Sequence, residues 1–357
     1  STLSITGNAE NAYQVLIASA PEIGGIGVTI DGFTIKGGNA SGLSSIMINT
    51  NIFYRYKGGG IYITYGTNTL TNNTIASNNA NNGSGIFIEW GINTLTNNTI
   101  TGNYATYGGG IFTNYGTNTL TNNTITGNTV EIYGGGIYTY SGTNTLTNNT
   151  ITGNTANTSG GGILTHYGTN SLTNNTITGN TANTSGGGIY TSYGTNSLTN
   201  NLFWNNKKGT NTTVQGADYA KNYYGTNTFT NNLLQLASSN YTGGDYDLGT
   251  AAGNIFAQNP MFVNESNPAG PDGIHRTADD GLRLQEVSLV INAGIASFGS
   301  PNVVPTADIL GTVRPQGGGV DIGAYEWFSI CYGATNLHVD ASVSTSGNGT
   351  SWASALK

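Results

Sequence analysis

The sequence is dominated by a phrase that returns every 25 or 26 residues and first appears in full as GTNTLTNNTIASN at residues 66–78. Periods of this length are typical of solenoids and propellers. The chain lacks the amphipathic Leu- and Ala-rich stretches of helical repeats, and 25 residues cannot supply the four strands of a propeller blade. The repeat therefore predicts an all-β solenoid, a parallel β-helix with three short strands in each coil. Three columns of large apolar residues keep the step: Ile61, Ile86, Ile111, Ile137, Ile163 and Ile189; Leu70, Leu95, Leu120, Leu146, Leu172 and Leu198; Ile75, Ile100, Ile125, Ile151, Ile177 and Phe203.

Two adjacent asparagines stand at one fixed point of every coil. Leu70 and Ile75 both belong in the core, yet a separation of five residues would put them on opposite faces of a straight strand. A corner must intervene, and Asn tolerates the left-handed backbone of a corner better than any other residue except Gly. Amides one coil apart are also expected to hydrogen-bond to each other as ladders. The predicted corner ladder comprises Asn72, Asn73, Asn97, Asn98, Asn122, Asn123, Asn148, Asn149, Asn174 and Asn175.

The pattern extends beyond the clearest repeats. The five-residue spacing recurs in Ile30 with Ile35 and in Phe229 with Leu234, and Ile5 matches one more third-strand position. These positions predict about nine coils. The chain then divides into coils over 1–236, an irregular C-terminal closing region over 237–330, and a tail over 331–357.

Two stretches of the closing region carry a more specific resemblance. They are GPDGIHRTADDGLRLQEVSLVINAG at 270–294 and DILGTVRPQGGGVDIGAYEW at 308–327. With these motifs the chain resembles bacterial right-handed parallel β-helix repeat proteins that carry a choice-of-anchor type C-terminal module. The resemblance covers about residues 1–327. It implies a right-handed helix and an extracellular or cell-surface location.

The tail, ATNLHVDASVSTSGNGTSWASALK at 334–357, resembles the beginning of such a module. Solenoid ends need caps, because an open coil exposes unpaired backbone. Two interpretations stay open: the chain is a slice of tandem modules, or its tail caps the next subunit head to tail. In both, the expected partner is another copy or module of the same kind. The cap-like strand would present Leu337, Val339, Ala341 and Val343.

Charge is sparse along the coils. Between Gly58 and Asn206 the only formal charges are Glu89 and Glu131. So few cations cannot neutralise phosphates, which argues against nucleic acid as a partner. Glu89 lies on a first strand and Glu131 in a loop after a third strand, so they are not expected to face each other as glycosidase carboxylates do. The sequence thus predicts no enzyme activity and no cofactor. It also predicts no membrane span, because no run of 18 apolar residues is present.

The closing region holds two acidic features. Asp272, Asp279 and Asp280 form an acidic, glycine-bearing loop that is expected either to bind a structural Ca²⁺ or to be a solvated turn. A second group is expected to close the region through charge-assisted hydrogen bonds. Its members are Arg314, Asp321 and Glu326.

An outward aromatic stripe follows the first strand of the coils, interrupted at Leu164. It comprises Tyr62, Phe87, Phe112, Tyr138 and Tyr190. A second aromatic column precedes the next corner: Tyr65, Trp90, Tyr115, Tyr167 and Tyr193. Stacked rings can stabilise a solenoid by themselves. The other interpretations are packing against another chain or the C-terminal segment, or a glycan-binding platform.

The outward positions of the second strand form T-x-T pairs. They are Thr69/Thr71, Thr94/Thr96, Thr119/Thr121, Thr145/Thr147 and Thr228/Thr230, with Ser171/Thr173 and Ser197/Thr199 as variants. The pattern resembles the flat Thr arrays of ice-binding solenoids, although Thr is also a good exposed strand residue. The sequence as a whole predicts a non-enzymatic extracellular structural protein, a surface stalk, adhesin or fibre module. A carbohydrate-binding adhesin that uses the aromatic stripe and an ice-binding solenoid are the two alternatives.

Overall fold

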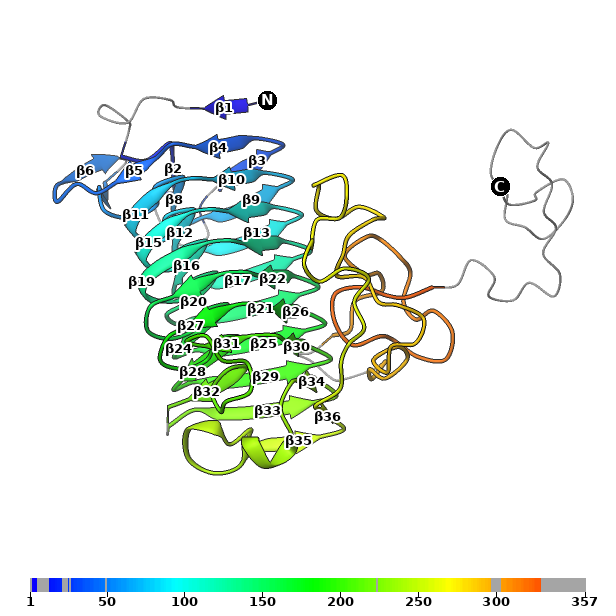
Figure 1. Ribbon diagram of the computed structural model, residues 1–357. Helices are drawn as coiled ribbons and strands as arrows, with labels where there is room; N and C mark the ends of the chain where they lie inside the picture. Colours follow the sequence, from blue (N-terminus) through cyan, green and yellow to red (C-terminus); the bar gives the residue numbers. More distant parts are fainter. Residues whose placement is uncertain are drawn as a thin grey trace, which may run out of the picture.

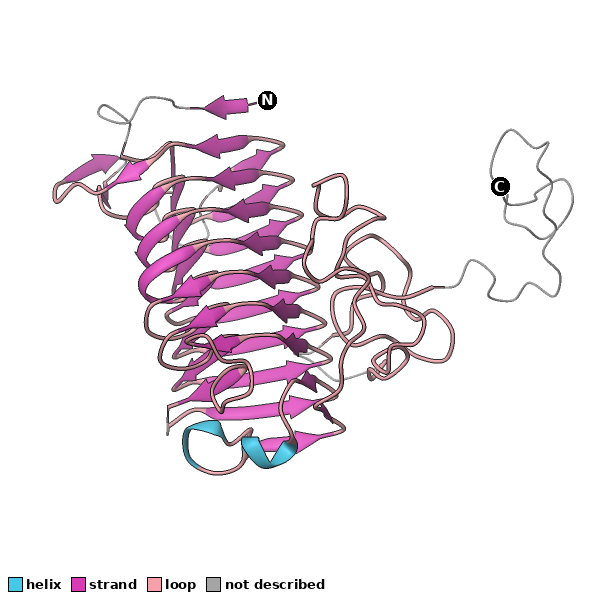
Figure 2. Cartoon of the chain, viewed as in Figure 1, coloured by secondary structure: helices cyan, strands magenta, loops and turns pink. Residues whose placement is uncertain are grey.

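A computed structural model describes residues 2–4, 13–20, 25, 27–48, 50–222, 224–296 and 303–328. The chain winds into a right-handed parallel β-helix, as predicted (Figures 1 and 2). The described residues after the last strand, 257–296 and 303–328, form an irregular lobe that packs along one side of the helix. Each regular coil contributes a strand to four sheets, not to the predicted three. In the described residues no helix has the length and hydropathy needed to cross a bilayer.

The four sheets are numbered here in the order in which a coil visits them. Sheet 1 consists of β2 (Leu16–Ser19), β8 (Ile61–Thr64), β12 (Ile86–Glu89), β16 (Ile111–Asn114), β20 (Ile137–Thr139), β24 (Ile163–His166), β28 (Ile189–Ser192) and β32 (Tyr219–Lys221). Sheet 2 consists of β3 (Thr29–Asp31), β9 (Thr67–Thr71), β13 (Ile92–Thr96), β17 (Thr117–Thr121), β21 (Thr143–Thr147), β25 (Thr169–Thr173), β29 (Thr195–Thr199), β33 (Thr226–Thr230) and β35 (Thr250–Ala252).

Sheets 3 and 4 complete each coil. Sheet 3 consists of β1 (Thr2–Ser4), β4 (Thr34–Lys36), β10 (Thr74–Ala76), β14 (Thr99–Thr101), β18 (Thr124–Thr126), β22 (Thr150–Thr152), β26 (Thr176–Thr178), β30 (Leu202–Trp204), β34 (Leu233–Leu234) and β36 (Ile255–Phe256). Sheet 4 consists of β5 (Asn39–Ala40), β11 (Asn79–Asn82), β15 (Tyr104–Tyr107), β19 (Thr129–Tyr133), β23 (Thr155–Ala156), β27 (Thr181–Ala182) and β31 (Lys207–Lys208). Outside these sheets lie a hairpin, β6 (Ser45–Ile48) with β7 (Asn51–Tyr54), and two 3₁₀ turns, η1 (Ser238–Tyr241) and η2 (Gly244–Tyr246).

The core is the set of three predicted apolar columns. Equivalent residues lie opposite one another in adjacent strands, as Ile86 lies between Ile61 and Ile111. All three column types are buried, with Ile61, Leu70 and Ile75 fully inaccessible. Burying an aliphatic side chain of this size contributes about 2 kcal/mol, so the columns repeat this contribution three times in every coil.

The fourth sheet escaped the sequence analysis because its inward side chains are small. Its strands point Ala80, Ala105, Val130, Ala156 and Ala182 toward the interior, and all of them are buried. An alanine in a loop-like sequence gives no hydrophobic column to detect. The strands form because their backbone groups pair in parallel with the coils on either side.

The predicted ends of the coils also need correction. Strands β35 and β36 pair with β33 and β34, so the helix continues past the predicted boundary at 236 to Phe256. Sheet 1 has eight strands, which corresponds to about eight full coils rather than nine. Near the N-terminus Leu3 pairs with Ile35, while the predicted position Ile5 lies outside the described residues.

The glycine triplet that opens each first strand is needed for two reasons. The first glycine has a left-handed backbone, as at Gly108 with φ 61°. The next two pass very close to the neighbouring coil: a Cβ added at Gly109 or Gly110 would lie 2.5 or 2.6 Å from a carbonyl oxygen of the next triplet. No side chain fits in that space, so the triplet permits the coils to stack at strand spacing.

Three ladders of buried asparagines run along the interior, one at each of three corners. In every step the side-chain Nδ2 donates to the Oδ1 one coil further on, at 2.8 to 3.1 Å. The sequence analysis predicted only the second ladder. The members are Asn68, Asn93, Asn118, Asn144, Asn170, Asn196 and Asn227; Asn73, Asn98, Asn123, Asn149, Asn175, Asn201, Asn232 and Asn254; and Asn78, Asn103, Asn128, Asn154, Asn180 and Asn206.

The two asparagines of each predicted corner have different roles. The first adopts left-handed angles, with φ between 53 and 56° from Asn72 to Asn174, and turns the chain. Only the second points inward and joins the ladder, as Asn123 does. The prediction that both members form the ladder is therefore wrong for Asn72, Asn97, Asn122 and Asn148. The reason is that two consecutive side chains at a corner cannot point to the same side. Asn174 makes one such contact, because it accepts from Asn200 Nδ2 at 3.4 Å, but the contact does not continue along the axis.

This division of roles predicts different consequences for two adjacent substitutions. In Asn123→Ala, the Asn98 N–H and the Leu95 carbonyl lose their buried partner, so the free energy of unfolding should fall by about 3 kcal/mol. In Asn122→Gly, the corner keeps a residue suited to φ 55°, and the change should stay within about 1 kcal/mol. Urea unfolding followed by circular dichroism measures both. Equal losses in the two variants would contradict the assignment.

Candidate functional site

The outer face of sheet 1 carries the predicted aromatic stripe, but most of the stripe is covered. Tyr62, Phe87, Phe112 and Tyr138 are 0, 1, 7 and 8% exposed. The hairpin β6–β7 places Phe53 on Tyr62, with ring centroids 4.8 Å apart. The stripe therefore cannot serve as an open platform for a glycan, which corrects that interpretation. Its principal role is to form a second hydrophobic cluster outside the sheet.

In the buried part of the stripe, each aromatic ring contacts the equivalent ring of the next coil. Tyr62 meets Phe87 at 5.1 Å, Phe87 meets Phe112 at 5.1 Å, and Phe112 meets Tyr138 at 4.6 Å. These separations lie in the favourable range for aromatic pairs. The column is interrupted one coil later, where Leu164 replaces a ring, and Tyr190 follows half-buried beyond the gap.

A cavity of about 310 Å³ opens at this interruption. Leu164 lies between Tyr138 and Tyr190 in the strand order, and all three residues line the cavity. Ser159, His166 and Ser192 also line it, so its wall combines rings with uncharged polar groups. Burial lowers the pKa of His166, which keeps the imidazole neutral near pH 7.

The second aromatic column borders the same face. Its residues have left-handed backbones, such as φ 66° at Trp90, which is uncommon for bulky side chains. The first ladder supports this corner, because Asn93 Nδ2 donates to the Trp90 carbonyl at 2.9 Å. Stacked pairs include Trp90 with Tyr115, 4.2 Å apart, and Tyr193 with Tyr224, 5.6 Å apart. The sequence analysis missed Tyr224, which extends the column by one coil.

One ion pair fastens the hairpin to this face. Lys57 Nζ lies 3.2 Å from Glu89 Oε1, and the Tyr62 hydroxyl donates to Glu89 Oε2 at 3.0 Å. The Lys57 ammonium also lies 4.6 Å from the centre of the Phe87 ring. Glu131, in contrast, lies in sheet 4 and accepts from the Tyr104 hydroxyl. The two glutamates lie in different sheets and do not face each other, as expected, although Glu131 lies on strand β19 and not in the predicted loop.

The irregular lobe packs on the outward side of sheet 3 (Figure 1). The first asparagines of several corners hold it by donating hydrogen bonds to its backbone carbonyls. Asn148 Nδ2 donates to the Ala307 carbonyl at 2.7 Å, and Asn174 Nδ2 donates to the Asp321 carbonyl at 2.9 Å. Earlier in the chain, Arg276 Nη1 donates to two corner carbonyls, those of Asn98 and Asn122, at 3.1 and 3.2 Å. The lobe thus spans several coils through polar contacts.

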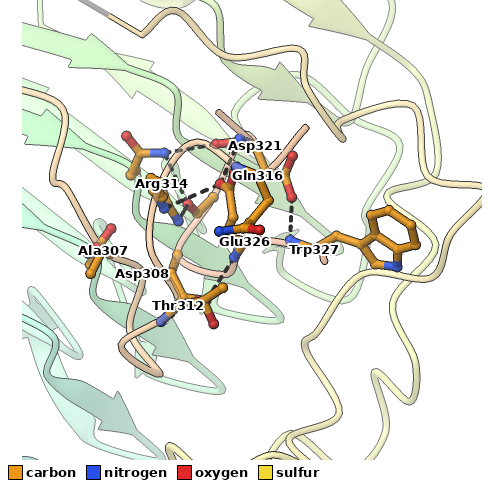
Figure 3. Close-up of polar contacts among 12 residues, drawn as sticks. Ala307, Asp308, Thr312, Arg314, Gln316, Asp321, Glu326 and Trp327 are labelled. Atoms are coloured by element: carbon orange, nitrogen blue, oxygen red, sulfur yellow. Dashed lines mark hydrogen bonds and ion pairs between the residues drawn. The ribbon is translucent and has the colours of Figure 1, made fainter. Parts of the chain in front are cut away.

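The predicted charge cluster lies at the centre of the lobe (Figure 3). Arg314 Nε lies 3.4 Å from Glu326 Oε2, and both side chains are fully buried. Asp321 accepts from the Asn292 N–H at 2.7 Å, and Asp308 accepts from the Glu326 N–H at 2.9 Å. Burial and the nearby Glu326 raise the pKa of Asp321 to about 7. The cluster closes the lobe onto itself, which is a structural role.

The three aspartates predicted to bind calcium serve different partners. Asp272 accepts from the Ile274 N–H, Asp279 from the Thr277 hydroxyl, and Asp280 from the Tyr325 hydroxyl at 2.7 Å. Asp280 is fully buried, and its Oδ2 also accepts from the Arg276 N–H of the same loop at 2.9 Å. No metal-binding group of three acidic, His or Cys side chains occurs in the part of the chain that the structure describes. The three aspartates are therefore not brought together as one ligand group, and calcium binding by this loop stays a prediction.

The T-x-T pairs form in-register ranks on sheet 2, with Thr94 between Thr69 and Thr119. The first four pairs are half-exposed. Further along the helix, Thr173 and Thr199 are 1% exposed, next to corner asparagines that hold the lobe. Both members of a pair are thus accessible only in the first four pairs.

A comparison with protein-family models identifies the family of this chain. The model described as "Right handed beta helix region" matches residues 31–203 and, in a second overlapping match, residues 108–260. The chain belongs to this family. A search of curated proteins found no match.

For this right-handed β-helix protein, the sequence analysis found the aromatic columns and the lobe cluster but missed the cavity. The sequence does contain the signal, because Leu164 interrupts the aromatic stripe. Whether this interruption leaves a cavity depends on how the side chains of the adjacent coils pack around it, and the alternation of residues along one strand does not show that packing. The predicted assembly strand, with Leu337, Val339, Ala341 and Val343, and Cys331 lie outside the described residues.

The two coil glutamates of this β-helix protein offer a matched test. In Glu89→Gln, the Lys57 ammonium would stay largely buried without a counter-charge, so the free energy of unfolding should fall by about 2–3 kcal/mol. In Glu131→Gln, an exposed group loses only surface contacts, and the change should be below about 0.5 kcal/mol. Thermal unfolding of both variants measures the difference. A Glu89→Gln variant as stable as the wild type would refute the stabilising role assigned to the Lys57–Glu89 ion pair.

Proposed function

We propose that this protein is a non-catalytic, rigid stalk or fibre module of an extracellular surface protein. The observation that carries the proposal is axial continuity. Sheet 2 runs in register from β3 to β35, and the three asparagine ladders accompany it. In a solenoid each coil contacts only its neighbours, so uninterrupted pairing along the axis produces a stiff rod.

The acidic side chains of the coils support a non-catalytic role. Between residues 27 and 236 the sequence has four of them, and each accepts a hydrogen bond from the protein; Asp245 and Asp247 follow in the last coil, within and directly after η2. The first four belong to different coils or sheets, whereas glycoside hydrolysis needs two carboxylates facing one bond. The four residues are Asp31, Glu89, Glu131 and Asp218.

Assembly and location rest on further observations. Strand β35 is the last strand of sheet 2, and all three of its side chains are exposed. An uncovered strand edge is a template for pairing with another chain. This edge supports head-to-tail contact with a second copy, with the tail at 331–357 as the proposed cap. The resemblance of 270–294 and 308–327 to segments of bacterial surface proteins supports the extracellular location.

Electron microscopy in negative stain tests the fibre proposal. We expect the full chain to form filaments at high concentration, and deletion of residues 334–357 to leave only short rods. A Thr250→Lys, Ala252→Lys double variant should also block filaments, because charges on an edge oppose strand pairing. If the full-length protein stays as single rods at every concentration, head-to-tail assembly is refuted, and only the proposal of a non-assembling stalk module remains.

Ice binding is a second candidate function, favoured by the geometry of the Thr ranks. On sheet 2, outward hydroxyls repeat at about 4.8 Å along the axis and about 6.8 Å along each strand, following the spacings of a parallel sheet. The ranks are half-exposed in β9, β13, β17 and β21. A regular array of hydroxyl and methyl groups is suited to an ordered layer of water.

Thermal hysteresis measures this second function. The wild type should depress the freezing point without changing the melting point to the same extent. Thr119→Lys, in the middle of the exposed ranks, should remove most of the effect, because one charge breaks the flat array. Asn81→Lys, on the exposed side of sheet 4, should keep it and serves as the control. Absence of hysteresis in the wild type would exclude ice binding.

A further inference from the structure

The gap in the aromatic stripe has the dimensions of one ring. Strands in adjacent coils lie about 4.8 Å apart, so Tyr138 and Tyr190, two coils apart, are separated by about 10 Å. A ring placed midway would lie about 5 Å from each tyrosine, a favourable distance for ring packing. The intervening Leu164 is 3% exposed and forms an apolar floor.

The cavity at this gap is large enough for a small ligand. Its volume, about 310 Å³, is at the lower end of the range for small-molecule sites. In the coils that carry Phe87, Phe112 and Tyr138, each ring contacts the ring of the next coil directly. Leu164 interrupts this series of ring contacts, and the cavity lies at that interruption.

The polar groups of the wall indicate which ring would enter. Ser159, Ser192 and the neutral imidazole of His166 can each both donate and accept hydrogen bonds. No Lys, Arg, Asp or Glu is among the described residues that line the cavity. Burial raises the pKa of the Tyr190 hydroxyl, and the negative charge of the nearby Asp245 raises it further, so the surroundings are unfavourable for an anion. Apolar ring faces with neutral hydroxyl partners at the edge match a neutral sugar.

We propose that the cavity above Leu164 binds one neutral pyranose unit of a carbohydrate, held between Tyr138 and Tyr190. The two tyrosine rings pack on the C–H faces of the sugar, and Ser159, Ser192 and His166 bond to its hydroxyls. The proposal goes beyond the stalk function, because it gives the rod a recognition site on its side. It also differs from the platform predicted from the sequence, since only the gap, not the covered stripe, takes part.

Saturation-transfer NMR on the full chain tests the proposal with defined probes. We expect cellobiose, maltose or lactose to bind at millimolar concentration, and digalacturonate and phenol to bind more weakly. Leu164→Tyr should weaken binding of the neutral sugar by at least about tenfold, because the new ring fills the vacancy. Since Tyr occupies the same position in both adjacent coils, at Tyr138 and Tyr190, this variant should fold.

Two further variants separate binding from stability. Leu164→Met keeps an aliphatic floor of similar volume and should bind within about threefold of the wild type. Tyr190→Ala removes one half-buried wall and should weaken binding without unfolding the helix. Circular dichroism checks the fold of each variant. The proposal is overturned if no neutral disaccharide binds the wild type, if Leu164→Tyr binds as well as the wild type, or if phenol or digalacturonate binds more tightly.

Discussion

The fold depends on keeping every buried amide paired. In all three ladders the Nδ2 donors point the same way along the axis, so each coil supplies the acceptor for the one before it. In the second ladder the same amide also donates to a core-strand carbonyl, as Asn123 does to Leu95 at 2.8 Å. A buried amide without partners is costly, so these contacts fix the register of the coils as well as their stability.

A unidirectional ladder needs a residue that can end it. In the third ladder the last asparagine, Asn206, donates to Asp218 Oδ1 at 3.1 Å. A carboxylate accepts at both oxygens and brings no amide hydrogens that would need a further acceptor. Asp218 also accepts from the Gln235 N–H and the Tyr241 hydroxyl. Burial raises the pKa of Asp218 to about 6, against the lowering effect of these hydrogen bonds. The charge of Asp218 is explained by its place at the end of the ladder.

On the outside of the helix, corner residues that do not belong to the ladders hold the lobe in place. Because the second asparagine of each corner points inward, the first is free to meet the lobe, and Asn174 and Asn200 both do so. Sheet 1 is covered differently, by a hairpin that Lys57 and Glu89 fasten to the aromatic stripe. The cavity lies further along the same sheet, at the coil of Leu164.

The sequence by itself determined the parallel β-helix, its apolar columns and the position of its main corner. Those features repeat locally, and the alternation of side chains fixes which residues enter the core. Tertiary structure decided the rest. The fourth sheet forms through backbone pairing between coils around small residues such as Ala105. The stripe was predicted correctly as outward, yet its burial depends on contacts between coils and on Phe53, which packs on Tyr62 from a hairpin outside the coils. The cavity depends on a contact between coils: a single leucine leaves space only because the rings on either side of it stand two strand spacings apart.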